Sequence, residues 1–181
     1  MRILYIITKI VTYPGAFLKA FWEHITCRLL GIPVIDRNYF APNLHFGHAN
    51  HLPAQTPGRA FLLAFMPLVA QRILGLIFLG AAAPPILLFG VRGAGDSYLF
   101  WVYVIGLFLG LSLMCNAFPQ WDSAKHQWQL FYGKAAKASL AGKILLAPLN
   151  AWLVAGAWLE KCGIPVISSL AAVIVILVLQ Y

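Results

Sequence analysis

Long apolar segments separated by short polar connections dominate the chain. Because about 20 apolar residues are needed for a helix to cross the hydrocarbon core of a bilayer, this pattern predicts membrane-spanning helices. We expect them at about residues 16–30, 59–82, 98–118 and 140–159, with a fifth, short segment at 164–179. The sequence therefore predicts an all-α multi-pass membrane protein with four or five transmembrane helices. Since no internal repeat or soluble domain interrupts the pattern, residues 1–181 form a single membrane domain.

Prolines and glycines predict where these helices begin and end. Pro14-Gly15 separates the first span from a short interfacial helix over residues 2–12, because proline suits a first helical turn and breaks an ongoing one. Pro67 predicts a kink, and Pro84-Pro85 predict the end of the second span. The longest connection, residues 31–58, begins with the β-rich stretch IPVIDRNYF, which predicts a hairpin packed against the membrane face.

Composition and charge support a membrane location. The chain is 61% hydrophobic and 10% charged, whereas soluble domains carry roughly 25% charged residues. The net charge of +8 is typical of cytoplasmic loops that face anionic headgroups, and no basic run indicates nucleic acid. The expected partners are the lipid bilayer and other membrane proteins. The three cysteines form no CxxC pair, so neither a disulfide framework nor a cysteine zinc site is predicted.

Loop charges predict the orientation. The more positive side, which should be cytoplasmic, carries Arg28, Arg37, Arg59, Lys125, Lys134, Lys137 and Lys143. The other side carries Arg2, Lys9, Arg92 and Lys161. If all five segments span, the N-terminus lies outside and the C-terminus inside. The stretch WDSAKHQWQLFYGKAAK, residues 121–137, combines aromatic and basic residues and predicts an interfacial helix on the cytoplasmic leaflet.

The segment YPGAFLKAFWEHITCRLLG, residues 13–31, places Lys19, Glu23 and His24 inside an apolar helix. Pro14-Gly15 precede this helix, Gly31 closes it and a β-like loop follows. In these features the chain resembles the intramembrane zinc metallopeptidases of the site-2 protease group and their small multi-pass bacterial relatives. The resemblance extends to Met66-Pro67 in the next helix and to SLMCNAFPQWDSAK, residues 112–125, where it implies that Asp122 corresponds to a third zinc ligand.

The motif itself is degenerate. In the family, histidines at i and i+4 of an HExxH helix bind zinc and the glutamate polarises the zinc-bound water. Aligned on Pro14-Gly15 and Gly31, these positions hold Lys19, Ala20 and Glu23. The resemblance therefore implies a non-catalytic, metalloprotease-like protein (a pseudoenzyme) of the bacterial inner membrane, with no cofactor and no catalytic residue. Such a protein would act as a subunit or adaptor of a membrane complex.

Lys19 and Glu23 are four residues apart, so they share a helix face and should pair, with Asp122 as a further balancing charge. Snorkelling of both to an interface is the alternative. His45, His48 and His51 form a second polar cluster, HFGHANH, which we interpret as a polar loop facing headgroups rather than a metal site. Gly106-x-x-x-Gly110 predicts a face for close helix packing.

Two other functions stay open. An active zinc metallopeptidase could use an atypical site drawn from His24, the loop histidines and Asp122. A small channel or transporter subunit could instead line a polar path with Lys19, Glu23 and Arg72.

Overall fold

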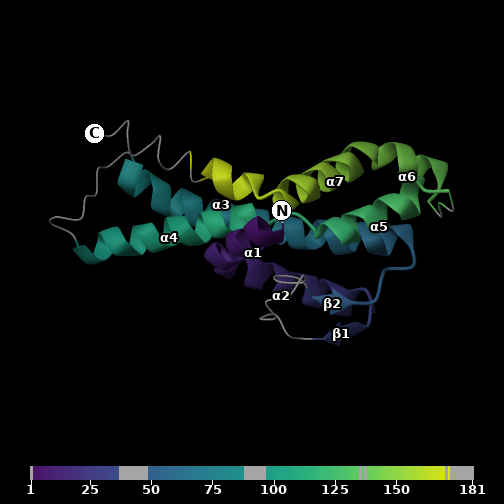
Figure 1. Ribbon diagram of the computed structural model, residues 1–181, viewed down its shortest axis with the longest axis horizontal. Coiled ribbons are helices and arrows are strands. Elements are labelled where there is room, and N and C mark those ends of the chain that lie inside the picture. Colours follow the sequence, from purple (N-terminus) through teal and green to yellow (C-terminus); the bar gives the residue numbers. More distant parts are fainter. Residues whose placement is uncertain are drawn as a thin grey trace.

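Helix α3 (Pro57–Leu87) runs along most of the length of the molecule, and several other helices pack against it (Figure 1). The computed structural model describes residues 2–36, 49–87, 97–134, 136, 138–169 and 171. Helix α4 (Ser97–Cys115) packs antiparallel along the second half of α3. Helices α5 (Trp121–Tyr132) and α7 (Ala147–Lys161) form an antiparallel pair near its first half, joined through the short helix α6 (Leu140–Leu145). Residues 164–169 are also helical.

Helix α2 (Tyr13–Leu29) packs against both α3 and α4, and α1 (Arg2–Val11) precedes it. The break between them falls at Thr12, one residue before the first turn that contains Pro14. The predicted hairpin is confirmed at its base: β1 (Val34–Asp36) pairs antiparallel with β2 (Asn50–His51). Residues 37–48, which include His45 and His48, lie outside the described residues.

Glycines allow α3 and α4 to approach closely. A Cβ atom added to Gly110 would lie 2.7 Å from the side chain of Leu79, and one added to Gly106 would lie 3.0 Å from Ala82. The helices can approach this closely because glycine has no side chain at either position. The predicted packing face of α4 is therefore confirmed. Gly75 on α3 meets Met114 in the same way.

Three predicted helix boundaries were wrong. Helix α3 continues through Pro84-Pro85 to Leu87 instead of ending there. Helix α4 ends at Cys115, because residues 116–120 turn before α5 begins. The predicted helix 140–159 is divided at Leu146, where Pro148 lies in the first turn of α7. Proline lacks the N–H that an interior helical turn requires, which explains the division at Leu146.

Among the described residues, two helices are long and apolar enough to cross a membrane: α3 and the Tyr98–Cys115 part of α4. Only 33% and 22% of their apolar windows are buried, whereas the core helix of a soluble protein would be mostly buried. Large apolar side chains project outward from both, with more than half of the side chain exposed at Ile73, Leu76, Ile77, Trp101, Val102 and Ile105. This exposure fits contact with lipid. Helix α2, with 17 residues, and α7, with 15, are shorter, and residues 172–179 lie outside the described residues.

Candidate functional site

Helix α2 presents Lys19, Ala20 and Glu23 on its buried face. Ala20 is fully buried, and Lys19 and Glu23 expose only 2% and 3% of their surface. A charged group removed from water in this way requires an opposite charge or hydrogen bonds to compensate its lost hydration. The partners of Lys19 and Glu23 therefore determine what this face of the helix can do.

Lys19 binds Glu160 of α7, and not Glu23 as we expected. Its Nζ lies 2.9 Å from Oε1 of Glu160. Lys9 of α1 binds the same oxygen at 2.6 Å and also donates to Oδ1 of Asn116 at 2.6 Å. The other carboxylate oxygen, Oε2, accepts the backbone N–H of Phe118 at 2.9 Å. One carboxylate thus connects α1, α2, α7 and the turn between α4 and α5.

The electrostatics of this cluster favour an ionised glutamate. Burial by itself raises the pKa of Glu160, but the Lys19 and Lys9 ammonium groups outweigh burial and hold that pKa below the ordinary value. Hydrogen bonds to the charged form of a carboxylate act in the same direction. We therefore describe Glu160 as a buried anion held between two cations.

Glu23 has a different role from the one we predicted. Its Oε2 accepts the backbone N–H of Ala49 at 3.0 Å, directly before β2. This bond attaches the base of the hairpin to α2. The tertiary arrangement explains the correction: Glu160 approaches Lys19 from another helix, while Glu23 lies one turn further along α2, beside the hairpin.

A second polar network fixes the junction between α1 and α2. The Gln71 side chain donates to the carbonyl of Gly15 at 2.7 Å, and the N–H of Gly15 donates to Oγ of Ser112 at 2.8 Å. Ser112 in turn donates to the carbonyl of Thr12 at 2.9 Å, and Asn116 donates to Oγ1 of Thr12 at 2.8 Å. Backbone groups freed at a helix break need such partners when buried.

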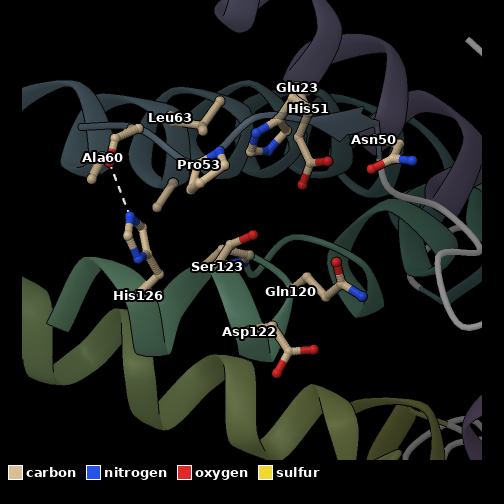
Figure 2. A pocket seen from close by; sticks show the side chains of 13 residues that line it. Glu23, Asn50, His51, Pro53, Ala60, Leu63, Gln120, Asp122, Ser123 and His126 are labelled. Atoms are coloured by element: carbon tan, nitrogen blue, oxygen red, sulfur yellow. Dashed lines mark hydrogen bonds between the residues drawn. The ribbon is translucent and has the colours of Figure 1, made fainter. Parts of the chain in front are cut away.

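A cavity of about 230 Å³ lies between α2, the hairpin, the start of α3 and α5. Figure 2 shows Glu23 and His51 on one wall, with Ser123 and Gln120 on the wall formed by the start of α5. His126 points toward the segment before α3, where its Nε2 lies 2.9 Å from the carbonyl of Ala54. The cavity is polar around these residues and apolar along α3, where Ala60, Leu63 and Ala64 line it.

The predicted site residues are only partly brought together. Glu23, His51 and Asp122 all line the cavity, but Asp122 is exposed and forms no ion pair with Lys19. Lys19 does not belong to the lining. Sequence reasoning missed Glu160 as a site residue, although it is the single acidic residue among the apolar residues of α7. Lys9 similarly interrupts the apolar residues of α1.

Lys19 and Ala20 do not fit a zinc ion. Zinc is bound by imidazole, thiolate or carboxylate, whereas the Lys19 ammonium has no free electron pair and Ala20 offers no base. Within the described ranges, no group of three or more histidine, cysteine, aspartate or glutamate side chains could hold a metal ion. In comparisons with known proteins, no family model, no curated protein and no solved structure matches this chain.

Proposed function

We propose that the protein is a non-catalytic, metalloprotease-like membrane protein that acts as a subunit or adaptor of a complex in the bacterial inner membrane. The observation that supports this most directly is the ion pair between Lys19 and Glu160. Lys19 stands at the position of the first zinc-binding histidine in the motif that the chain resembles. A cation at this position, paired with a carboxylate, would maintain the helix packing of a zinc site without binding a metal.

The cavity beside Glu23 supports a binding role. Its walls come from four parts of the chain, and its polar groups include two acids, Glu23 and Asp122, and two histidines. Its apolar floor on α3 offers contact area for a side chain. These features suit a segment of a partner protein that inserts one side chain between α2 and α5.

The atypical metallopeptidase has less support. Glu23, His51, Asp122 and His126 all line the cavity, but no three such side chains among the described residues are arranged to hold a metal ion. The channel hypothesis has less support, because the lining includes Glu23 but neither Lys19 nor Arg72.

Metal analysis separates the first two functions. Protein purified in mild detergent without chelator should contain far less than one zinc per chain, and added zinc should not raise its thermal stability. A variant with Asp122→Asn and His126→Gln should give the same result. One zinc per chain in the wild type, lost in this variant, would establish the metallopeptidase candidate and refute the adaptor.

The binding role is tested by filling the cavity. Ser123→Trp places a large side chain on the cavity wall, and Ser168→Trp makes the same change at an exposed helical position. If a partner occupies the cavity, a membrane protein that co-purifies at a fixed ratio with the wild type should be lost from Ser123→Trp and retained by Ser168→Trp. Equal recovery from both variants would exclude the cavity as the binding site.

A further inference from the structure

Helix α6 directs its apolar side chains away from the rest of the described chain. Leu140, Ile144 and Leu145 expose 75%, 69% and 78% of their surface, and Ala141 is exposed as well. Because residues four apart lie above one another on a helix, these four side chains form two adjacent rows, which we call the α6 face. An exposed apolar surface of this kind marks a contact with another molecule or with a membrane.

Hydrogen bonds hold α6 in this orientation. The hydroxyl of Tyr132, at the end of α5, donates to the carbonyl of Lys143 at 2.8 Å. The Oγ of Ser139 accepts the N–H of Gly142 at 3.2 Å and caps the start of the helix. The α6 face is therefore presented outward by a folded and anchored helix.

The position of α6 places it near the membrane surface. It lies at the end of the molecule where α3 begins (Figure 1), and Arg59 is exposed at that end. Trp128 and Tyr132 lie beside each other on α5 with ring centres 4.4 Å apart, and Trp128 exposes 39% of its surface. Tryptophan and tyrosine concentrate at the headgroup level of a bilayer. We therefore expect the α6 face at the boundary between headgroups and acyl chains.

The charges around α6 favour anionic lipid as the contact. Residues 123–159 contain four lysines and no acidic residue. Lys125 and Lys134 are exposed, and Lys143, which belongs to α6 itself, is partly exposed. A helix that lies in the membrane interface characteristically combines an apolar face with lysines beside it, and such lysines are attracted to anionic headgroups.

We propose that α6 lies in the plane of the membrane and inserts the α6 face among the acyl chains of one leaflet, while Lys134 and Lys143 bind the phosphate groups of anionic lipids. Interfacial helices of this kind bury their apolar face about 5–10 Å into the boundary. Helix α6 is then a surface anchor and not the first part of a membrane-spanning helix over residues 140–159. The anchor does not involve the cavity between α2 and α5, so it goes beyond the binding role proposed above.

The first test measures what surrounds the α6 face in full-length protein reconstituted in liposomes of phosphatidylglycerol and phosphatidylcholine. A nitroxide is attached to Ile144→Cys with Cys162→Ser as background, since the two other cysteines are buried. Its collisions with oxygen, which concentrates among acyl chains, are compared with its collisions with a water-soluble nickel chelate. Gln129→Cys, at an exposed position of α5, is the reference for water, and Leu76→Cys, on the apolar surface of α3, is the reference for lipid.

The ratio of oxygen to nickel collisions should be several-fold higher at residue 144 than at residue 129 and should approach the value at residue 76. A ratio as low as that at residue 129 would place the α6 face in water and overturn the proposal. Few collisions with either reagent would also overturn it, because the face would then be covered by protein, such as a second copy of this chain.

The second test asks whether the lysines bind the headgroups. Phosphatidylglycerol added to the protein in mild detergent should raise the melting temperature more than phosphatidylcholine does, and the double variant Lys134→Gln with Lys143→Gln should lose most of that difference. Lys161→Gln, at the opposite end of α7 from α6, should keep it. Each shift is measured against the same variant without added lipid. Equal shifts with the two lipids, or the same loss in Lys161→Gln, would overturn the proposal.

Discussion

Glu160 joins three other parts of the chain, although the sequence did not single it out. It accepts hydrogen bonds from two lysines on different helices and from the backbone of Phe118. Removing one member of a buried ion pair leaves the other charge without compensation, whereas replacing the whole group with apolar residues can be nearly neutral. The cluster around Glu160 should therefore respond very differently to single and combined substitutions.

We predict that Glu160→Gln lowers the free energy of unfolding by about 3–5 kcal/mol, because it leaves two buried ammonium groups without an anion. Lys19→Met should cost less, since Lys9 still pairs with Glu160. The combined replacement of Lys9 and Lys19 by methionine and Glu160 by leucine should recover much of the loss. Unfolding in detergent measures all three. Asp122→Asn, at an exposed acid, is the control, and a Glu160→Gln variant as stable as this control would contradict the prediction.

The same residue predicts a pH dependence. Because the pKa of Glu160 is lowered in the folded protein from its ordinary value of 4.5, the unfolded chain binds a proton at higher pH than the folded chain does. The stabilisation by Glu160 is thus complete above about pH 4.5 and is lost as the pH falls through the lower folded pKa. Melting temperatures measured between pH 6 and pH 3 should fall more steeply for the wild type than for Glu160→Gln. Parallel curves would show that Glu160 contributes nothing.

At the scale of elements, the crossing of α2 and α4 depends on Gly15. A Cβ atom there would collide with the backbone carbonyl of Ser112, which cannot rotate away as a side chain could. Gly15 also takes part in hydrogen bonds to Ser112 and Gln71 through its own backbone. Gly15 thus contributes both to the close approach of α2 and α4 and to the polar network at the α1–α2 junction.

We predict that Gly15→Ala destabilises the protein by about 1–3 kcal/mol, the usual cost of overpacking. Gly80→Ala is the matched control, because nothing lies within 4 Å of a Cβ added there and alanine is the better helix former by up to about 1 kcal/mol. Chemical unfolding of the two variants should therefore give changes in the free energy of unfolding that have opposite signs. A neutral Gly15→Ala would mean that α2 and α4 separate more easily than their packing suggests.

The sequence predicted helices better than it predicted their partners. Apolar length and the Pro14-Gly15 pair located α2 and α3 closely, and IPVID located β1, because these signals are local. The partner of Lys19 was wrong because a lysine at i and a glutamate at i+4 satisfy a local rule, while Glu160 is 141 residues away. Nothing local indicates which distant helix reaches a buried charge. The cavity was missed as a whole for the same reason, since its walls meet only in the folded chain.

At the scale of the whole molecule, the end of α5, the short helix α6 and the start of α3 lie at the same end (Figure 1). Arg59, Lys134 and Lys143 belong to these segments, and a concentration of basic residues favours the cytoplasmic side. We therefore retain the orientation predicted from the loops.

We predict that a cysteine at Ser139 and one at Thr56, each introduced with Cys162 replaced by serine, resist a membrane-impermeant thiol reagent in intact cells. Both should react after the membrane is opened. Mass-tagged maleimide and gel electrophoresis measure the labelling. Reaction of either cysteine in intact cells would reverse the orientation, and reaction of only one would mean that the two segments lie on opposite sides.

The length of α3 bears on the depth in the membrane at which a partner could bind. Its 31 residues extend about 46 Å at 1.5 Å per residue, while the hydrocarbon layer is about 30 Å thick. Even at a tilt of 40°, the upper end of the usual range, the helix extends about 35 Å along the bilayer normal. One end of α3 must therefore extend into the headgroup region. We expect it to be the end that carries Arg59, because a charged side chain is stable in contact with water. Ala60 and Ala64 on that end form the cavity floor, so a membrane-spanning α3 places the cavity at headgroup level, where the proposed partner would bind through a segment outside the hydrocarbon layer.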